Sequence, residues 1–131
     1  MLTALIDYES GNLHSALKAF EKISSENSLG SVTITNDPEI ISNADRLVLP
    51  GDGAFPTCKA ALEKSEVFEA LKHAVLAKRR PFLGICVGMQ LMAKKGFEFE
   101  PTNGLNWING QVERIQLLSL IHISEPTRPT P

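Results

Sequence analysis

Cys86 lies in a five-residue pattern that is typical of a nucleophile. Glycines stand two positions before it and two after it, in Gly84-Ile85-Cys86-Val87-Gly88. The pattern G-x-C-x-G has the form of the G-x-S-x-G nucleophile elbow, a sharp turn from a strand into a helix. In such a turn the nucleophile takes a strained backbone conformation, and the glycines prevent a collision where strand and helix converge. The alternative is a buried structural thiol between strand and helix.

The backbone around Cys86 is expected to supply the electrostatics of a catalytic site. A helix that starts after the cysteine favours the thiolate, and the N–H of Val87 faces the place where a carbonyl oxygen becomes negative. A second glycine turn, at residues 49–56, contains Gly51 and Gly53, and an amide near Gly53 is a candidate second oxyanion donor. Because reactive groups of open α/β sheets gather outside the carboxyl ends of the strands, both turns are expected in one crevice. A plain tight turn is the alternative for residues 49–56.

The segments that position these turns alternate between strands and helices. Short apolar or β-branched runs predict buried strands at residues 2–7, 32–36, 46–51 and 81–86. Apolar residues at helical spacing predict helices at residues 13–23, 37–44, 57–79 (broken near Ser65) and 87–96, the last ending at Gly96. Asn109-Gly110 is typical of a two-residue hairpin turn between strands at residues 106–108 and 111–115. This order predicts an α/β fold, with an open, mainly parallel sheet and helices on both faces.

Composition limits the classes of protein to which the chain can belong. Its 131 residues, 43% hydrophobic and 21% charged, suit a single core. The net charge is −2 and the basic residues cluster only at Lys78-Arg79-Arg80, so we expect no nucleic-acid partner. No apolar run approaches the roughly 20 residues of a membrane span. The N-terminus carries no signal-peptide pattern and the chain has two cysteines, which favours a cytoplasmic protein.

Several segments together resemble the class I (triad-type) glutamine amidotransferases. They are "IDYESGNLHS" at residues 6–15, "LPGDGAFP" at 49–56, "PFLGICVGMQLM" at 81–92 and "GLNWINGQVERI" at 104–115. Within that class they are most similar to the glutaminase subunits of imidazole glycerol phosphate synthases. The resemblance implies a flavodoxin-like topology and an enzyme that hydrolyses L-glutamine. It also implies delivery of ammonia to a cyclase subunit, a (β/α)₈ barrel, in histidine biosynthesis.

The resemblance assigns roles to residues at matching positions, and it implies no cofactor and no metal. Cys86 becomes the nucleophile that attacks the glutamine amide. The remaining roles are the oxyanion donors Gly53 and Val87; the substrate-binding residues Gly51, Gln90 and Glu98; and the residues towards the partner interface, Tyr8, Gly11 and Asn12.

The chemical groups of L-glutamine fit the side chains of two of these residues. Gln90 stands one helical turn after the cysteine, and Glu98 is expected at the end of the same helix. The ammonium group of glutamine needs an acceptor such as a carboxylate, and its amide needs a fixed distance to the sulfur. Without the resemblance, Glu98 would simply be a solvated carboxylate, and Asn12 would be a helix cap.

The sequence departs from the family pattern after residue 117. The family places its catalytic histidine and acid in a downstream H-x-E motif, and none of His14, His73 and His122 stands in such a motif. We therefore expect residues 1–117 to be the N-terminal part of an amidotransferase domain, truncated before its C-terminal half and inactive alone. Residues 118–131, "LSLIHISEPTRPTP", are expected to be a non-native disordered tail, because residues 118–128 resemble a translated sequencing adapter.

Two other functions stay open at this point. One is a non-catalytic, flavodoxin-like binding module in which the glycine turns bind a small anion and Cys86 is structural. The other is a different class I amidotransferase, since the G-x-C-x-G turn also occurs in related cysteine hydrolases. Genomic sequence that continues in frame into H-x-E would favour the glutaminase over the binding module.

Overall fold

A parallel sheet forms the centre of the computed structural model, which describes residues 1–115. Its four strands are β1 (Leu2–Ile6), β2 (Ser31–Thr35), β3 (Arg46–Leu49) and β4 (Phe82–Gly84), in the order β2-β1-β3-β4. All three strand pairings are parallel. The expected α/β fold and flavodoxin-like strand order are confirmed. The tail expected at residues 118–131 lies outside the described residues.

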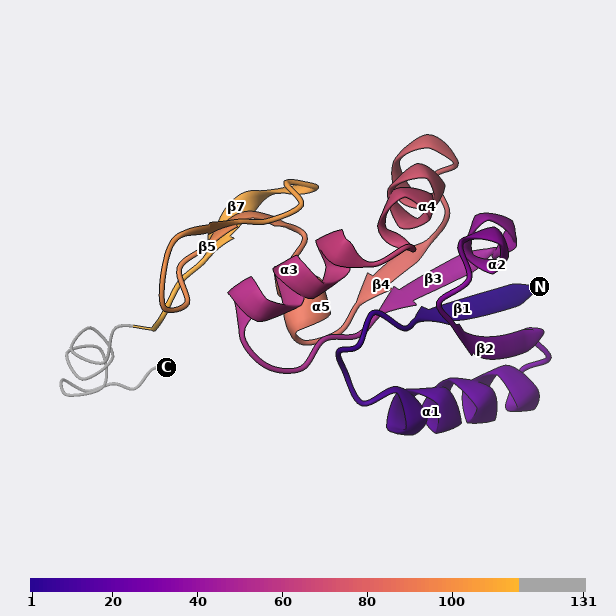
Figure 1. The fold of residues 1–131 in the computed structure, drawn as a ribbon. Helices are drawn as coiled ribbons and strands as arrows, with labels where there is room; N and C mark the ends of the chain where they lie inside the picture. The colour runs from indigo at the N-terminus through magenta and orange to yellow at the C-terminus, as the bar shows by residue number, and fades with distance from the viewer. Residues whose placement is uncertain (116–131) are drawn as a thin grey trace, which may run out of the picture.

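Helices cover both faces of this sheet, as Figure 1 shows for α1 on one face and for α2 and α4 on the other. The helical segments are α1 (Leu13–Glu26), α2 (Pro38–Asn43), α3 (Phe55–Lys64), α4 (Phe68–Lys72), η1 (His73–Ala77, a π-helical turn) and α5 (Val87–Gln90). Asp37 caps α2 through a hydrogen bond from the Glu39 N–H, with Pro38 at the first helical position.

The larger core lies between the sheet and α2, α3 and α4. Successive strand residues point to opposite faces. Ala4 and Ile6 therefore join the cluster under these helices, whereas Leu5, also fully buried, faces the α1 side. The largest buried side chains of the cluster are Tyr8, Phe55, Ile6, Ile41, Leu47, Leu49, Leu62, Leu71 and Leu91. Each large apolar side chain buried in this way contributes roughly 1.5–3 kcal/mol of transfer free energy.

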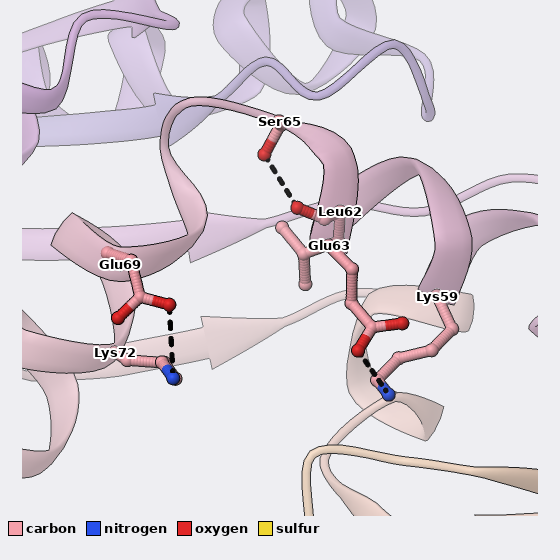
Figure 2. A network of polar contacts seen from close by, with 6 residues as sticks. All are labelled: Lys59, Leu62, Glu63, Ser65, Glu69 and Lys72. Atoms are coloured by element: carbon pink, nitrogen blue, oxygen red, sulfur yellow. Dashed lines mark hydrogen bonds and ion pairs between the residues drawn. The ribbon is translucent and has the colours of Figure 1, made fainter.

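A break separates α3 from α4 where the sequence predicted one. Ser65 leaves the helical conformation at ψ 153°, and its hydroxyl donates a hydrogen bond to the Leu62 carbonyl at 2.7 Å (Figure 2). Two ion pairs lie on either side of the break: Lys59–Glu63 at 3.4 Å and Lys72–Glu69 at 3.2 Å. Because these pairs reach the surface, the buried apolar residues matter more for stability than the pairs do.

The expected helix at residues 87–96 is wrong beyond its first turn. Only α5 is helical, and the chain then enters β5 (Ala93–Gly96). The Leu91 carbonyl accepts from Leu105 N, and the Met92 carbonyl accepts from the N–H groups of Trp107 and Ile108. Backbone N–H groups of residues 105–108 therefore occupy carbonyls that would accept hydrogen bonds within a longer helix. This competition overrides the local helical pattern.

The expected hairpin turn at Asn109-Gly110 is also wrong. Both residues lie inside β7 (Ile108–Val112), which pairs in parallel with β5, while β6 (Thr102–Asn103) pairs antiparallel on the other side of β5. The register passes from Ala93↔Ile108 to Lys95↔Gln111, so β7 carries one extra residue there. Asn109-Gly110 therefore lies in a β-bulge and does not reverse the direction of the chain. Figure 1 shows this second, three-stranded sheet apart from the first.

None of the helices formed by residues 1–115 combines the length and the apolar character that a membrane crossing demands.

Two leucines in the α4–η1 segment test where stability resides. Leu71 is fully buried, whereas Leu76 is 55% exposed. We expect Leu71→Ala to lower the free energy of unfolding by about 2–5 kcal/mol, because it opens a cavity under the helix. The matched Leu76→Ala variant should change it by about 0.5 kcal/mol or less. Urea unfolding followed by circular dichroism measures both, and equal losses would contradict this assignment of the core.

Candidate active site

Cys86 occupies a strained turn between β4 and α5. Its backbone lies at φ 55° and ψ −122°, and its side chain is exposed. A non-glycine residue with positive φ outside the left-handed helical basin is rare and costs of order 1–3 kcal/mol. The alternative of a buried structural thiol is therefore wrong, and the turn has the strain expected of a nucleophile elbow.

The two flanking glycines stand where a side chain would collide. A Cβ atom on Gly84 would lie 2.6 Å from the Cα of Met89, and one on Gly88 would overlap the Leu49 carbonyl oxygen. The Leu49 carbonyl also accepts a hydrogen bond from Ile85 N at 3.0 Å. The G-x-C-x-G spacing is thus explained by how closely the elbow approaches the end of β3.

The second glycine turn meets the elbow, as the sequence predicted. A Cβ atom on Gly51 would lie 2.5 Å from Gly88 N and 3.0 Å from the carbonyl carbon of Val87. Gly53 has φ +109° and no described heavy atom within 4 Å of the position of a Cβ. The loop therefore packs on the elbow at Gly51 and is open at Gly53.

Two backbone N–H groups are expected to be oxyanion donors, those of Val87 and Gly53. Neither makes a hydrogen bond among residues 1–115. A free N–H next to a nucleophile, such as that of Val87 directly after Cys86, is a donor of the kind that a developing oxyanion requires. The expected field of a long helix is absent, because α5 has only four residues. The dipole of so short a helix adds little to the field at Cys86.

Gln90 and Glu98 come together at one cavity of about 640 Å³. Phe97, Phe99, Val112, Glu113 and Arg114 also line it. No local pattern in the sequence pointed to the last three, because the pairing of β7 with β5 is what brings the end of β7 and the residues after it to the same cavity. Glu98 follows β5 instead of ending a helix, and its Oε1 accepts a hydrogen bond from Phe55 N at 2.9 Å. This carboxylate caps α3, whose own N-cap residue, Ala54, has no side-chain acceptor.

The first loop lies against the glycine turn. Tyr8, expected near a partner interface, is buried, because its ring packs in the core and its hydroxyl donates to the Pro50 carbonyl at 2.6 Å. Gly11 rests on Pro50, where a Cβ atom would lie 2.8 Å from the proline Cβ. Asn12 is exposed and caps α1 by accepting from Ser15 N at 3.3 Å. Of the three, Asn12 is the exposed one.

No histidine completes the site within the described residues. His14 lies in α1 and His73 begins η1, and neither bonds to Cys86; His122 falls outside residues 1–115. In the same part of the chain, no three His, Cys, Asp or Glu side chains are grouped as metal ligands would be.

The two thiols should differ in reactivity. Cys58 is buried and its sulfur lies 3.1 Å from the Ser10 hydroxyl, whereas Cys86 is exposed. We expect iodoacetamide to alkylate Cys86 at least about tenfold faster, because modification of Cys58 requires local opening. Peptide mass spectrometry on the folded chain measures both rates, and the urea-unfolded chain is the control in which they converge. Equal rates in the folded chain would contradict this geometry.

Tyr8 should make stability depend on pH in the alkaline range. Burial raises the pKa of its phenol, so the folded chain keeps it neutral at a pH where the unfolded chain ionises it. The free energy of unfolding should fall above about pH 10, by up to roughly 1.4 kcal/mol per pH unit from this group. Tyr8→Phe should remove this part of the slope. Tyr8 is the only tyrosine in the chain, so absorbance at alkaline pH follows it directly, and ionisation near its ordinary pKa in the folded chain would refute the prediction.

Comparison with known proteins agrees with this geometry. Residues 4–102 match the family described as "Glutamine amidotransferase class-I". The chain is 59% identical over 116 residues to "Imidazole glycerol phosphate synthase subunit HisH" of Ruegeria pomeroyi, covering 88% of this chain and 55% of that protein. Proteins of the same name from Cereibacter sphaeroides and Caulobacter vibrioides are 54% identical over 116 residues and 49% identical over 114.

These alignments cover 88% and 86% of this chain but 55% and 54% of the two latter relatives. The chain thus spans about half the length of the curated relatives it matches. The family match extends over the first loop, the glycine turn and the Cys86 elbow, which are the parts that the structure brings together. The chain belongs to the class I glutamine amidotransferase family.

Proposed function

We propose that this chain supplies the nucleophile half of a glutaminase that releases ammonia for a cyclase partner in histidine biosynthesis. The observation that carries the proposal is the strained, exposed Cys86 at an elbow packed against the Gly51–Gly53 turn. The name shared by the relatives from Ruegeria, Cereibacter and Caulobacter favours this synthase over other class I amidotransferases. A binding module would have no need of a strained thiol that is open to solvent.

The reaction proceeds by nucleophilic catalysis at Cys86. The thiolate attacks the side-chain amide carbon of glutamine, and the N–H groups of Val87 and Gly53 stabilise the oxyanion. The C–N bond then breaks and ammonia leaves with a proton from a general acid. Water hydrolyses the thioester to glutamate and restores the thiol. The acid and base belong to the H-x-E motif of the family, which the 131 residues do not contain.

Gln90 and Glu98 are proposed to hold the amino-acid end of glutamine in the cavity that they line. Gly51, which packs on the Cys86 elbow, is proposed to contact the substrate next to that elbow. Glu98 uses Oε1 for the Phe55 N–H, so Oε2 is the oxygen that accepts from the ammonium group. One carboxylate would thereby fix both the substrate and the start of α3. A fixed ligand position relative to the sulfur is what a near-attack geometry requires.

The cyclase, a (β/α)₈ barrel, is proposed to form a heterodimer with this subunit through the edge that carries Gly11 and Asn12. The exposed Asn12 side chain is the contact residue, while Tyr8 supports that loop from the core. Because Cys58 and Cys86 are both free thiols, we place the enzyme in the cytoplasm.

A chimera tests the proposed activity. Residues 1–115 of this chain are joined to the remaining C-terminal part of the Ruegeria relative and mixed with the cyclase of that organism. We expect the chimera to release ammonia from glutamine, and Cys86→Ala to reduce turnover at least about 10⁴-fold, because no other nucleophile can form the thioester. The 131-residue chain alone should be inactive, because loss of the general base by itself removes a factor of roughly 10²–10⁴.

Ser65→Ala in the chimera is the control, and it should retain most of the activity, because the Ser65 hydroxyl binds the Leu62 carbonyl at the end of α3 and no residue of the site. Turnover that survives Cys86→Ala would disprove the nucleophile assignment. Turnover by the short chain that depends on Cys86 would show that a histidine of this chain acts as the base. Failure of the chimera to bind the cyclase, with a folded circular dichroism spectrum, would count against the proposed partner.

A further inference from the structure

The dipeptide Asn-Gly occurs twice in the second sheet, as Asn103-Gly104 and as Asn109-Gly110. Asparagine is a chemically labile residue. When glycine follows it, the glycine nitrogen can attack the asparagine side-chain amide, because a residue without a Cβ leaves the approach open. Both asparagines are exposed, and each follows a β-branched residue, Thr102 or Ile108. Because the two local sequences are alike, the surrounding structure decides which of them reacts.

The structure restrains the first pair. Gly104 N donates a hydrogen bond to the Lys94 carbonyl at 2.9 Å. A Cβ atom on Gly104 would overlap the Ala93 carbonyl oxygen, so the backbone there is in close contact with β5. An attack by Gly104 N on Asn103 therefore requires the loss of this hydrogen bond and a rotation that the contact opposes.

The second pair lies in the bulge of β7 and lacks these restraints. The register assigns no partner on β5 to Asn109 or to Gly110. The Lys94 carbonyl, which lies opposite the bulge, is engaged on the other side of β5 by Gly104 N. A Cβ atom on Gly110 would have no described heavy atom within 4 Å, and β7 is an edge strand of its sheet. Gly110 therefore meets no steric barrier when its peptide rotates towards the side chain of Asn109.

We propose that Asn109 is a site of spontaneous deamidation, which the bulge favours over Asn103. Gly110 N loses its proton to water and bonds to the Cγ of Asn109. The Cγ–Nδ2 bond breaks, and Nδ2 leaves as ammonia with a proton from solvent. Water then opens the cyclic imide at either carbonyl. The products are aspartate and isoaspartate, in which the main chain runs through the side-chain carbon. Water is the only co-reactant.

Isoaspartate adds a carbon to the main chain between Ile108 and Val112, two residues that β5 and its flanking residues hold. Ile108 N donates to the Met92 carbonyl, and the Val112 carbonyl accepts from Phe97 N, each at 2.9 Å. The added carbon must be accommodated between these two bonds. Val112 and the two residues after it line the cavity of the candidate active site, so the modification reaches the wall of that cavity.

Ageing of the 131-residue chain at physiological temperature and mildly alkaline pH tests the proposal. Peptide mass spectrometry with electron-transfer fragmentation measures asparagine, aspartate and isoaspartate at each position. We expect Asn109 to deamidate at least about tenfold faster than Asn103 in the folded chain, because Asn103 reacts only after local opening. In the urea-unfolded chain the two rates should converge, since only the local sequence then acts on them.

Two variants separate the reaction at Asn109 from general ageing. Gly110→Ala has room for its methyl group but places a Cβ beside the attacking nitrogen, and it should slow deamidation of Asn109 at least about tenfold. Asn103→Gln is the matched control and should leave the rate at Asn109 unchanged.

Hydrogen exchange measures the effect on β7. Exchange at the Phe97 N–H should be faster in the purified isoaspartate form than in the unmodified chain. It should be unchanged in Asn109→Asp, which has the added charge without the added carbon.

Equal rates at Asn103 and Asn109 in the folded chain would overturn the proposal. A rate at Asn109 that rises about tenfold or more on unfolding would also overturn it, because the bulge would then restrain Asn109 as a regular strand does. Unchanged exchange at Phe97 in the isoaspartate form would refute the effect on β7.

Discussion

The close approach between the end of β3 and the turn after β4 is the constraint on which this structure depends. The Leu49 carbonyl accepts from Ile85 N, and Gly88 lies so near that oxygen that no side chain fits between them. Gly51 packs on the same turn. With the two backbones in contact, the chain can pass from β4 into α5 only through a sharp turn, and Cys86 takes the strained position in it.

The loop that faces this elbow is held by side chains from two distant parts of the chain. Tyr8 binds the Pro50 carbonyl, Ser10 binds both backbone groups of Asp52, and Glu98 binds the N–H of Phe55. The contacts come from the first loop and from the segment after β5. A change in either segment can therefore reach this loop without touching Cys86.

Local sequence patterns were misleading where tertiary hydrogen bonds competed with them. The apolar spacing after Cys86 is helical, yet Leu105, Trp107 and Ile108 donate to carbonyls that a longer helix would need. Asn109-Gly110 is typical of a hairpin turn, yet in the structure it lies at a β-bulge within β7, which pairs with β5. The break at Ser65 was predictable because its cause is local: the Ser65 hydroxyl satisfies the Leu62 carbonyl at the helix end.

The sequence by itself determined the parallel sheet, the elbow at Cys86 and the second glycine turn, because apolar runs and glycine spacing record local backbone requirements. The resemblance to the amidotransferases assigned Gln90 and Glu98 to one substrate, and both line one cavity. Only the tertiary structure decided that Tyr8 is buried, that Glu98 caps α3 and that Ser10 holds Asp52. Each of these depends on a hydrogen bond between residues at least 42 positions apart, and no local pattern encodes which distant donor will reach a given acceptor.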